Sequence, residues 1–430
     1  MTSAGTTAGL SPTRSVLPGG VVTIVQETSF SPAVSISASF RAGSVHEPAG
    51  RHGLAWFLGR VVDRGTTARS ADAIAEALDD RGVALRVSTN RHVTTVSCTC
   101  LSEDFTEMLA VIADVAQNAT FHEAEIDKRR AETITMIRQD ADNPAVRASE
   151  TLQSLLYGPG HPYGYPVKGS VETVECIGRG DLLSLHRARF APSTLSLVVV
   201  GDVSAEEVRE SAARAFGDWR VEPSPEGHVP PAPRPADRRL VTIDMPEKAQ
   251  SDIAYGFTSI TRLDPSYCSH WMMNTILGQF GLGGRIADNI RERQGMAYYA
   301  YSAFDPSRGP GPLVIRAGVD AQNVDRTIDA IDVEVRALAL RGATERELAE
   351  TRRYLIGSIP RMLENNPSIA AFLQTAEFFE LGMDYDRRLP SMLDAVTLDD
   401  IHEAAASVLD PDRASIAVAG PHAAPQPPSR

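Results

Sequence analysis

Residues 51–66 read R-H-G-L-A-W-F-L-G-R-V-V-D-R-G-T. After the glycine at position 53, apolar residues recur three and four positions apart, which is typical of one face of a helix. The stretch therefore predicts a helix over residues 54–63. It lies between two groups of alternating apolar and polar residues, which favour strands on either side of it.

The chain as a whole divides near its middle. Residues 221–239 are dense in proline and polar residues and show no apolar periodicity, which predicts an extended linker. For a chain of 430 residues this suggests two domains of about 200 residues each. We expect them to cover residues 16–220 and 240–423.

Both halves present their predicted elements in the same order, with strands first and long helices later. In the first half we expect strands at 21–26, 34–40, 85–88, 92–101 and 195–200, and helices at 54–63, 71–81, 104–118 and 123–140. In the second half we expect strands at 252–257, 297–304, 312–319 and 414–419, and helices at 267–278, 285–293, 324–341 and 345–355. This order predicts an α+β fold of two homologous domains, each a mostly antiparallel sheet packed against helices.

Charge and composition exclude several classes of protein. The net charge of −13 argues against a nucleic-acid partner, because phosphate binding needs clustered Lys and Arg. The sequence has no apolar run of roughly 18 residues and no apolar secretion signal at its start, so we predict no membrane association. The four cysteines show no C-x-x-C spacing, which favours reduced thiols and a cytoplasmic protein.

The stretch quoted first resembles the inverted zinc signature of the pitrilysin and mitochondrial processing peptidase family. In active members the helix reads G-L-A-H-F-L-E-H-M-x-F-K-G-T, and Gly53-Leu54-Ala55, Phe57-Leu58 and Gly65-Thr66 match it in place. Residues 161–166, H-P-Y-G-Y-P, followed by Gly169, are similar to another segment of the family, and so is the R-x-x-F-A-P run at 187–192. The resemblance covers most of the first half.

The positions that would carry the chemistry are changed. In active members two His at i and i+4 bind zinc, and a Glu at i+3 polarises the zinc-bound water. The resemblance places Trp56, Gly59 and Arg60 at these three positions, and none of them can bind zinc or act as a base. It places Met136 at the third ligand, a Glu about 76 residues beyond the second His in active members. We therefore expect no zinc in this chain.

The second half keeps a different part of the family pattern. Residues 278–302 resemble the segment G-x-x-S-R-L-x-x-x-I-R-E-x-x-G-L-A-Y-x-V, in which an Arg and a Tyr seven residues later help to bind substrate. The resemblance assigns these roles to Arg291 and Tyr298. Arg can donate a forked pair of hydrogen bonds, and a Tyr hydroxyl can donate to a carbonyl oxygen that gains negative charge. Alternatively, Arg291 is a surface residue and Tyr298 begins a strand by propensity alone.

Taken together, the resemblance implies a non-catalytic, substrate-binding subunit of a heterodimeric zinc metallopeptidase. The zinc would lie on a homologous partner subunit, the substrate would be a peptide, and this chain would be inactive alone. One alternative is a non-proteolytic scaffold or assembly protein derived from the same fold. Another is a peptidase with a different metal site. The histidines of the chain, including His46, His52, His92 and His122, show no H-x-x-x-H or H-x-x-E-H spacing.

Overall fold

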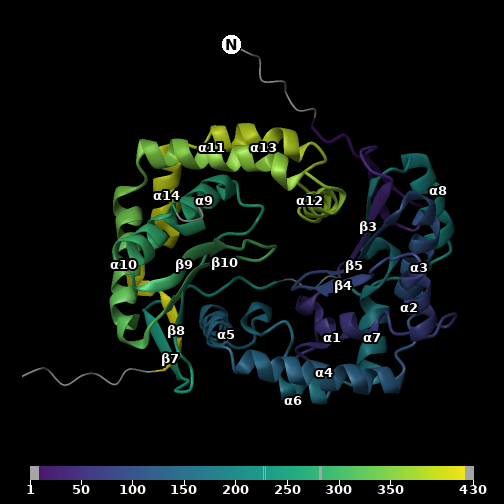
Figure 1. Ribbon diagram of the computed structural model, residues 1–430, viewed down its shortest axis with the longest axis horizontal. Coiled ribbons are helices and arrows are strands. Elements are labelled where there is room, and N and C mark those ends of the chain that lie inside the picture. Colours follow the sequence, from purple (N-terminus) through teal and green to yellow (C-terminus); the bar gives the residue numbers. More distant parts are fainter. Residues whose placement is uncertain (1–8, 226, 228, 280–282, 422–430) are drawn as a thin grey trace, which may run out of the picture. The chain divides into compact units, whose positions relative to one another are not determined.

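Two β-sheets organise the chain, one in each of two structural units (Figure 1). The computed structural model describes residues 9–225, 227, 229–279 and 283–421. Unit 1 takes in the described residues up to 137, from 166 to 227, and 358–389. Unit 2 takes in those of 138–165, 229–357 and 390–421.

The sheet of unit 1 has six strands in the order β1-β2-β6-β3-β5-β4. Only the β2–β6 pair is parallel, so the sheet is mostly antiparallel. The strands are β1 (Thr13–Val16), β2 (Val22–Glu27), β3 (Ala33–Phe40), β4 (Arg86–Thr89), β5 (Thr94–Leu101) and β6 (Leu195–Gly201).

The sheet of unit 2 has five strands in the order β7-β11-β8-β10-β9, with β7–β11 as the one parallel pair. The strands are β7 (Arg239–Asp244), β8 (Ser251–Thr258), β9 (Ala297–Phe304), β10 (Pro312–Val319) and β11 (Ser415–Gly420). Five strands of the first sheet, β2 to β6, correspond to the five strands of the second, β7 to β11. When each set is numbered 1 to 5 along the chain, both sheets have the spatial order 1-5-2-4-3. The α+β fold is confirmed, and the repeated topology supports the predicted duplication.

The helices of the first half agree with their predicted positions to within two residues at each end. They are α1 (Leu54–Val61), α2 (Ala71–Asp79), α3 (Phe105–Asn118) and α4 (Glu123–Ala141). The sequence did not predict four shorter or later helices, α5 (Pro144–Tyr157), α6 (Val171–Glu175), α7 (Arg179–Arg189) and α8 (Ala205–Phe216). The core of unit 1 packs α1, α3, α7 and α8 against one face of the sheet.

The helices of the second half depart further from the prediction. The helix expected at 267–278 is α9 (Tyr267–Asn274) followed by a π-helical turn, η5 (Thr275–Gln279), and the one expected at 285–293 is a second π-helical turn, η6 (Ala287–Arg293). The other helices are α10 (Val324–Arg341), α11 (Glu345–Met362), α12 (Asn366–Phe378), α13 (Tyr385–Asp394) and α14 (Leu398–Val408). No described helix combines the length and the apolar character needed to cross a membrane.

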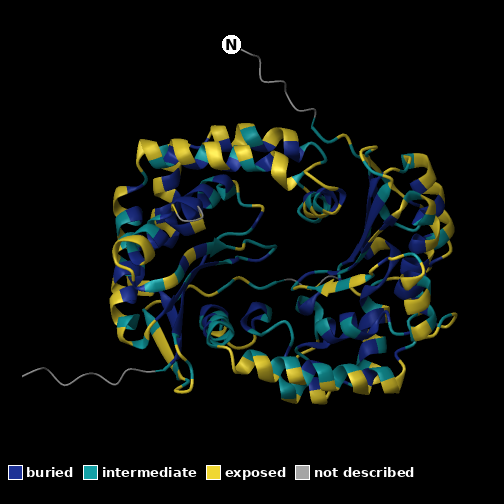
Figure 2. Cartoon of the chain, viewed as in Figure 1, coloured by how far each residue is buried: buried dark blue, intermediate teal, exposed yellow. Residues whose placement is uncertain are grey.

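Two helices from corresponding places in the two halves are exchanged between the units. Helix α5 comes from the first half of the chain but packs on β8 and β11 of unit 2. Helix α12 comes from the second half but packs on β3 and β6 of unit 1, which are the counterparts of β8 and β11. Strands β3, β8 and β11 are consequently buried on both faces (Figure 2).

Because of this exchange, the two structural units do not coincide with the two predicted domains. The compact units are discontinuous in sequence, so they do not test where one homologous half ends and the next begins. The bounds 16–220 and 240–423, with a linker at 221–239, stay a prediction about the halves. Within the described residues, no helix or strand lies between α8 and β7.

Candidate functional site

Helix α1 begins at a closely packed turn. Gly53 at its N-terminus has a φ of 94°, and a Cβ there would lie 2.5 Å from the carbonyl oxygen of Lys168. The Glu47 carboxylate accepts hydrogen bonds from the backbone N–H groups of Gly53 (3.1 Å) and Ala55 (2.8 Å). These bonds satisfy N–H groups that the first turn of a helix leaves without a partner. The start of α1 is therefore fixed by side chains outside the helix.

The two faces of α1 differ. Leu54, Phe57, Leu58 and Val61 are buried in the core of unit 1. Trp56 and Arg60 are only partly buried and lie one turn apart, with the Arg60 Cζ atom 5.7 Å from the centre of the Trp56 ring. The two residues that the resemblance places at the His positions of the signature therefore contact each other.

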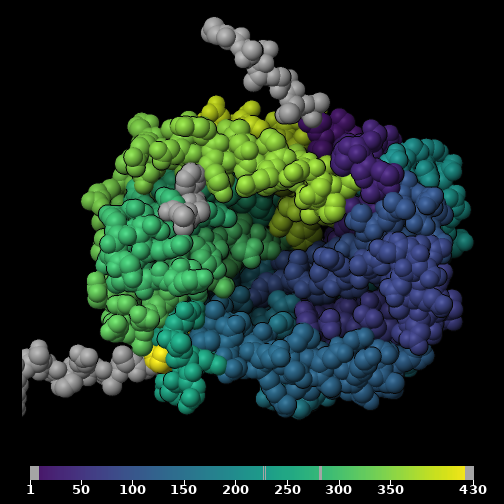
Figure 3. Space-filling model, in the orientation of Figure 1, coloured from purple at the N-terminus to yellow at the C-terminus, as the bar shows by residue number. Residues whose placement is uncertain are grey.

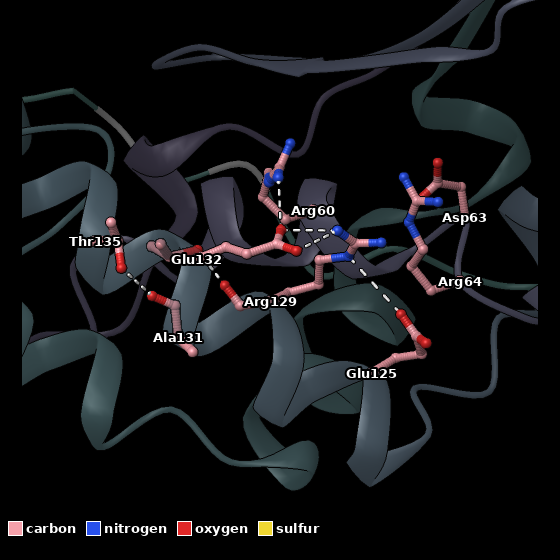
Figure 4. A network of polar contacts seen from close by, with 9 residues as sticks. Arg60, Asp63, Arg64, Glu125, Arg129, Ala131, Glu132 and Thr135 are labelled. Carbon is pink, nitrogen blue, oxygen red and sulfur yellow. Dashed lines mark hydrogen bonds and ion pairs between the residues drawn. The ribbon is translucent and has the colours of Figure 1, made fainter.

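The Arg60 guanidinium also binds a carboxylate of helix α4 (Figure 4). Arg60 Nη2 donates to Glu132 Oε2 at 3.2 Å, and Arg129 Nη1 donates to both oxygens of Glu132 at 2.8 and 2.7 Å. The hydrogen bonds from Arg129, with the positive charges of Arg129 and Arg60, hold the pKa of Glu132 below its ordinary value. Arg129 Nε in turn lies 3.8 Å from Glu125 Oε2.

A third pair extends this network. Asp63 is buried and lies 3.1 Å from Arg64 Nε. Burial raises the pKa of Asp63, while the positive charges of Arg64, Arg129 and Arg60 act in the opposite direction. The site thus contains three arginines and three carboxylates. We call these six residues the ion network: Arg60, Asp63, Arg64, Glu125, Arg129 and Glu132.

The donor set does not fit a zinc ion. Trp56, Gly59 and Arg60 offer no ligand atom, and the Glu132 carboxylate is already held by two guanidinium groups. Met136 lies one turn after Glu132 in α4 and brings only a thioether. Among the residues that the structure describes, no group of three or more His, Cys, Asp or Glu side chains is arranged to hold a metal.

Gly59, which the resemblance places at the position of the general base, is closely packed. A Cβ there would lie 2.6 Å from Oγ1 of Thr89 in the edge strand β4, a contact too short for real atoms. Thr89 Oγ1 is itself hydrogen-bonded to Thr94 Oγ1 at 3.0 Å. A larger residue at position 59 must therefore displace Thr89 or move α1 away from β4.

This packing predicts that Gly59→Ala destabilises the protein. Overpacking costs about 1–3 kcal/mol, and the better helix propensity of Ala offsets about 1 kcal/mol of that. Gly357 in α11 is the matched control, because it is exposed and has no neighbouring atom within 4 Å of a built Cβ. Gly357→Ala should stabilise by about 0.5–1 kcal/mol. Denaturant unfolding of both variants measures the difference, and an equal gain for both would contradict the close contact at Gly59.

Glu47 predicts a pH dependence of stability. Its side chain is buried, and burial raises its pKa from 4.5 to about 8, against the opposing effect of the two backbone hydrogen bonds and of Arg91. The folded state then binds more protons than the unfolded state between these two values. The free energy of unfolding should therefore fall as pH rises from about 4.5 to 8, by at most about 1.4 kcal/mol per pH unit.

The variant Glu47→Gln isolates this contribution, because its side chain does not titrate. Its stability relative to the wild type should improve as pH rises through this window, measured by urea unfolding at pH 5, 6.5 and 8. His52, with Nδ1 4.0 Å from Glu47 Oε2 and a pKa lowered by burial, is present in both proteins. Parallel stability curves for the two proteins would contradict the assignment.

Arg291 and Tyr298 lie in unit 2, whereas α1 lies in unit 1. Arg291 belongs to η6, is exposed, and has its Nε atom 3.6 Å from Glu292 Oε1. Helical turn η6 packs on β9, the strand that carries Tyr298. Both residues therefore sit on neighbouring elements of the same unit.

Tyr298 occupies a β-bulge. In the pairing of β9 with β10, Tyr299 lies opposite Gly318 and Ala297 lies opposite Val319, so Tyr298 is the additional residue between them. Its side chain is 84% exposed, although simple alternation would place it on the buried face with Ala300. Bulges of this kind re-aim side chains and are frequent next to functional sites. No pattern in the sequence marked this bulge.

The H-P-Y-G-Y-P segment has a structural part in unit 2. His161 Nδ1 accepts a hydrogen bond from the Tyr163 backbone N–H, and its Nε2 atom is 3.0 Å from the carbonyl oxygen of Pro230. The buried Tyr163 hydroxyl accepts from the backbone N–H of Gly309 at 3.0 Å. These contacts join the segment to the chain before β7, at Pro230, and to the connection between β9 and β10, at Gly309.

Comparison with known proteins places this geometry in a family. Residues 22–161 match the family described as Insulinase (Peptidase family M16), and residues 177–355 match the family described as Peptidase M16 inactive domain. The two matches together span most of the chain. The chain belongs to the M16, or pitrilysin, family. The resemblance noted in the sequence is thus confirmed, as is the half-length type of M16 chain.

Several proteins match this chain over nearly their whole length. The M16 chain is 28% identical to an uncharacterized zinc protease of Mycobacterium tuberculosis over 426 residues, which is 96% of this chain and 94% of the relative. It is similar to the solved structure of a peptidase M16 inactive domain from Pseudomonas fluorescens (TM-score 0.90, 24% identity, 97% of this chain and 100% of that one). It is also similar to a protease from Helicobacter pylori (TM-score 0.87, 15% identity, 96% and 100%).

Proposed function

We propose that this M16 chain is the non-catalytic, substrate-binding subunit of a heterodimeric zinc peptidase. The observation that carries the proposal is a contrast between the two units. In unit 1 the positions that the resemblance assigns to the zinc ligands hold Trp56, Arg60 and Met136, and the position of the base holds Gly59. Arg60 belongs to the ion network. In unit 2 the family's substrate-side residues are kept, and a bulge exposes Tyr298.

The kept residues have the chemistry to hold a peptide. Arg291 carries a permanent positive charge and can donate two parallel hydrogen bonds to a peptide carbonyl or carboxylate. Tyr298 can donate its hydroxyl proton to the carbonyl oxygen that becomes negative when the peptide bond is attacked. Neither residue supplies a metal or a base, so both of these would belong to a homologous partner subunit.

Reconstitution tests this proposal. The purified chain should contain no stoichiometric zinc by elemental analysis and should leave fluorogenic peptides uncut. Mixed with an M16 homologue from the same genome that has an intact H-x-x-E-H, it should give far higher turnover than the homologue alone. A Gln variant of that homologue's signature Glu is the control and should abolish the activity of the mixture.

Two outcomes would contradict the proposal. Stoichiometric zinc in the chain, or peptide cleavage by the chain alone, would show that it carries its own catalytic centre. The alternative of a non-proteolytic scaffold predicts that a complex forms without any gain in turnover. Size-exclusion chromatography of the mixture, run beside the activity assay, separates these cases.

A further inference from the structure

One face of the sheet in unit 2 is covered over only part of its width. Helix α5 packs on this face over β8 and β11, where a Cβ at Gly256 would lie 2.9 Å from Leu152 Cδ2. Residues Asp252 and Ala254 of β8 share this face with Gly256, because side chains alternate along a strand. Across β10 and β9 the same face continues beyond α5 to Tyr299 and Tyr301, through two cross-strand rows.

The first row is Asp252, Gly318 and Tyr299, directly opposite one another on β8, β10 and β9. The Tyr299 ring lies across Gly318, because a Cβ there would be 2.6 Å from Tyr299 Cε1. Its hydroxyl donates to the Asp252 carboxylate, and burial together with this carboxylate raises the pKa of Tyr299. The negative charge of Asp252 therefore already has a partner.

The second row is Ala254, Arg316 and Tyr301. The Tyr301 side chain is 39% exposed, and its ring centre lies 5.8 Å from that of Tyr299. Arg316 is partly exposed, and its positive charge acts on the neighbouring Tyr299 hydroxyl. It has no hydrogen bond or close ion pair with a residue in the part of the chain that the structure describes. By contrast, Arg285 and Arg238 of the same unit are each paired with a carboxylate.

We propose that Arg316 and Tyr301 form a subsite that selects an acidic side chain of the peptide. This inference rests on the proposed function, since it assumes a peptide beside Tyr298. The side-chain carboxylate of Asp or Glu would accept hydrogen bonds from Arg316, and the apolar part of that side chain would lie on the Tyr301 ring. Arg316 forms no close ion pair with a described residue, so an anionic side chain is the complementary occupant of the subsite.

The strand geometry sets the distance of this subsite from the bulge. Positions 298 and 301 are three residues apart on β9, which corresponds to about 10 Å at roughly 3.3 Å per residue. An extended peptide has the same rise. The acidic residue should therefore lie about three residues from the carbonyl group that Tyr298 contacts.

Binding of labelled peptides to the purified full-length chain tests the subsite. Sets of 12-residue peptides differ only in having Glu, Gln or Lys at one scanned position, and fluorescence anisotropy gives Kd. At one position Glu should bind about three-fold more tightly than Gln, as expected for a partly exposed ion pair, and the preference should weaken with added salt. Arg316→Gln should remove the preference, and Arg316→Glu should shift it to Lys.

The controls separate this inference from the function on which it rests. The Arg346 side chain of helix α11 is 83% exposed, so Arg346→Gln should keep the Glu preference. Helix α11 appears in light green on the surface in Figure 3. Tyr301→Ala should weaken the Glu and Gln peptides alike. A Glu preference that survives Arg316→Gln, or no Glu preference at any position, overturns the subsite. Either result leaves the reconstitution test of the proposed function standing by itself.

Discussion

A fragment ending at residue 225 is expected not to fold, although it contains all six strands of the first sheet. Without α12, the fragment exposes Ile24, Val198 and Val200, which the intact chain buries against Ile369 and Leu373. Each of these apolar side chains contributes about 1.5–3 kcal/mol when buried, so the loss approaches the whole stability of a typical domain. The fragment also loses the hydrogen bonds that Gln374 Nε2 donates to the backbone oxygens of Ser37 (2.8 Å) and Ser196 (3.0 Å).

Circular dichroism and solubility after expression show whether the fragment folds. Two variants of the full chain test the contribution of α12 separately. Leu373→Asp places a charge in the buried cluster and should unfold unit 1 at room temperature. Ala371→Asp lies on the exposed side of the same helix and should cost less than about 1 kcal/mol. A soluble fragment that melts cooperatively would show that α12 is dispensable.

In the reconstituted complex, Tyr298→Phe should lower kcat by about 10²-fold, the usual cost of removing one donor to a developing oxyanion. Arg291→Ala should act mainly on KM, because a guanidinium that orients the peptide binds it before and during the reaction. Arg293→Ala is the matched control, since Arg293 follows in the same helical turn and pairs with Asp288 at 2.6 Å. Steady-state kinetics on one fluorogenic peptide give kcat and KM for all three variants.

Unchanged kinetics for both variants, with the complex intact by size-exclusion chromatography, would remove the proposed roles of Arg291 and Tyr298. That result would favour the scaffold alternative, in which the exposed tyrosine has no substrate to contact. A loss of kcat in Tyr298→Phe with no loss of complex would support the substrate-side role.

The sequence was sufficient for features that depend on neighbouring residues. The apolar spacing of residues 54–63 predicted α1 to within two residues, and the strands at 297–304 and 312–319 match β9 and β10 at both ends. The assignment of Trp56, Gly59 and Arg60 to the signature positions also rests on the sequence, and it stays a prediction. These features need only local periodicity and the chemistry of single side chains.

The sequence could not predict features that depend on distant partners. Helices α5 and α12 pack on the sheet of the other half, and no local pattern records which sheet a helix covers. The bulge at Tyr298 arises from the register of β9 against β10, and the contact of Gly59 with Thr89 arises from the distance between α1 and β4. The Arg60–Glu132 hydrogen bond likewise joins two residues that are 72 positions apart in the sequence.

The ion network also bears on the evolutionary history of the chain. A single change of Arg60 to His removes a bond to Glu132 and a contact with Trp56 before any ligand set exists. A change of Gly59 to Glu places a side chain against Thr89, and a change of Arg129 leaves Glu132 with one cation instead of two. Each single change toward the zinc signature of the family therefore breaks an existing contact, and natural selection would have to fix several such changes together.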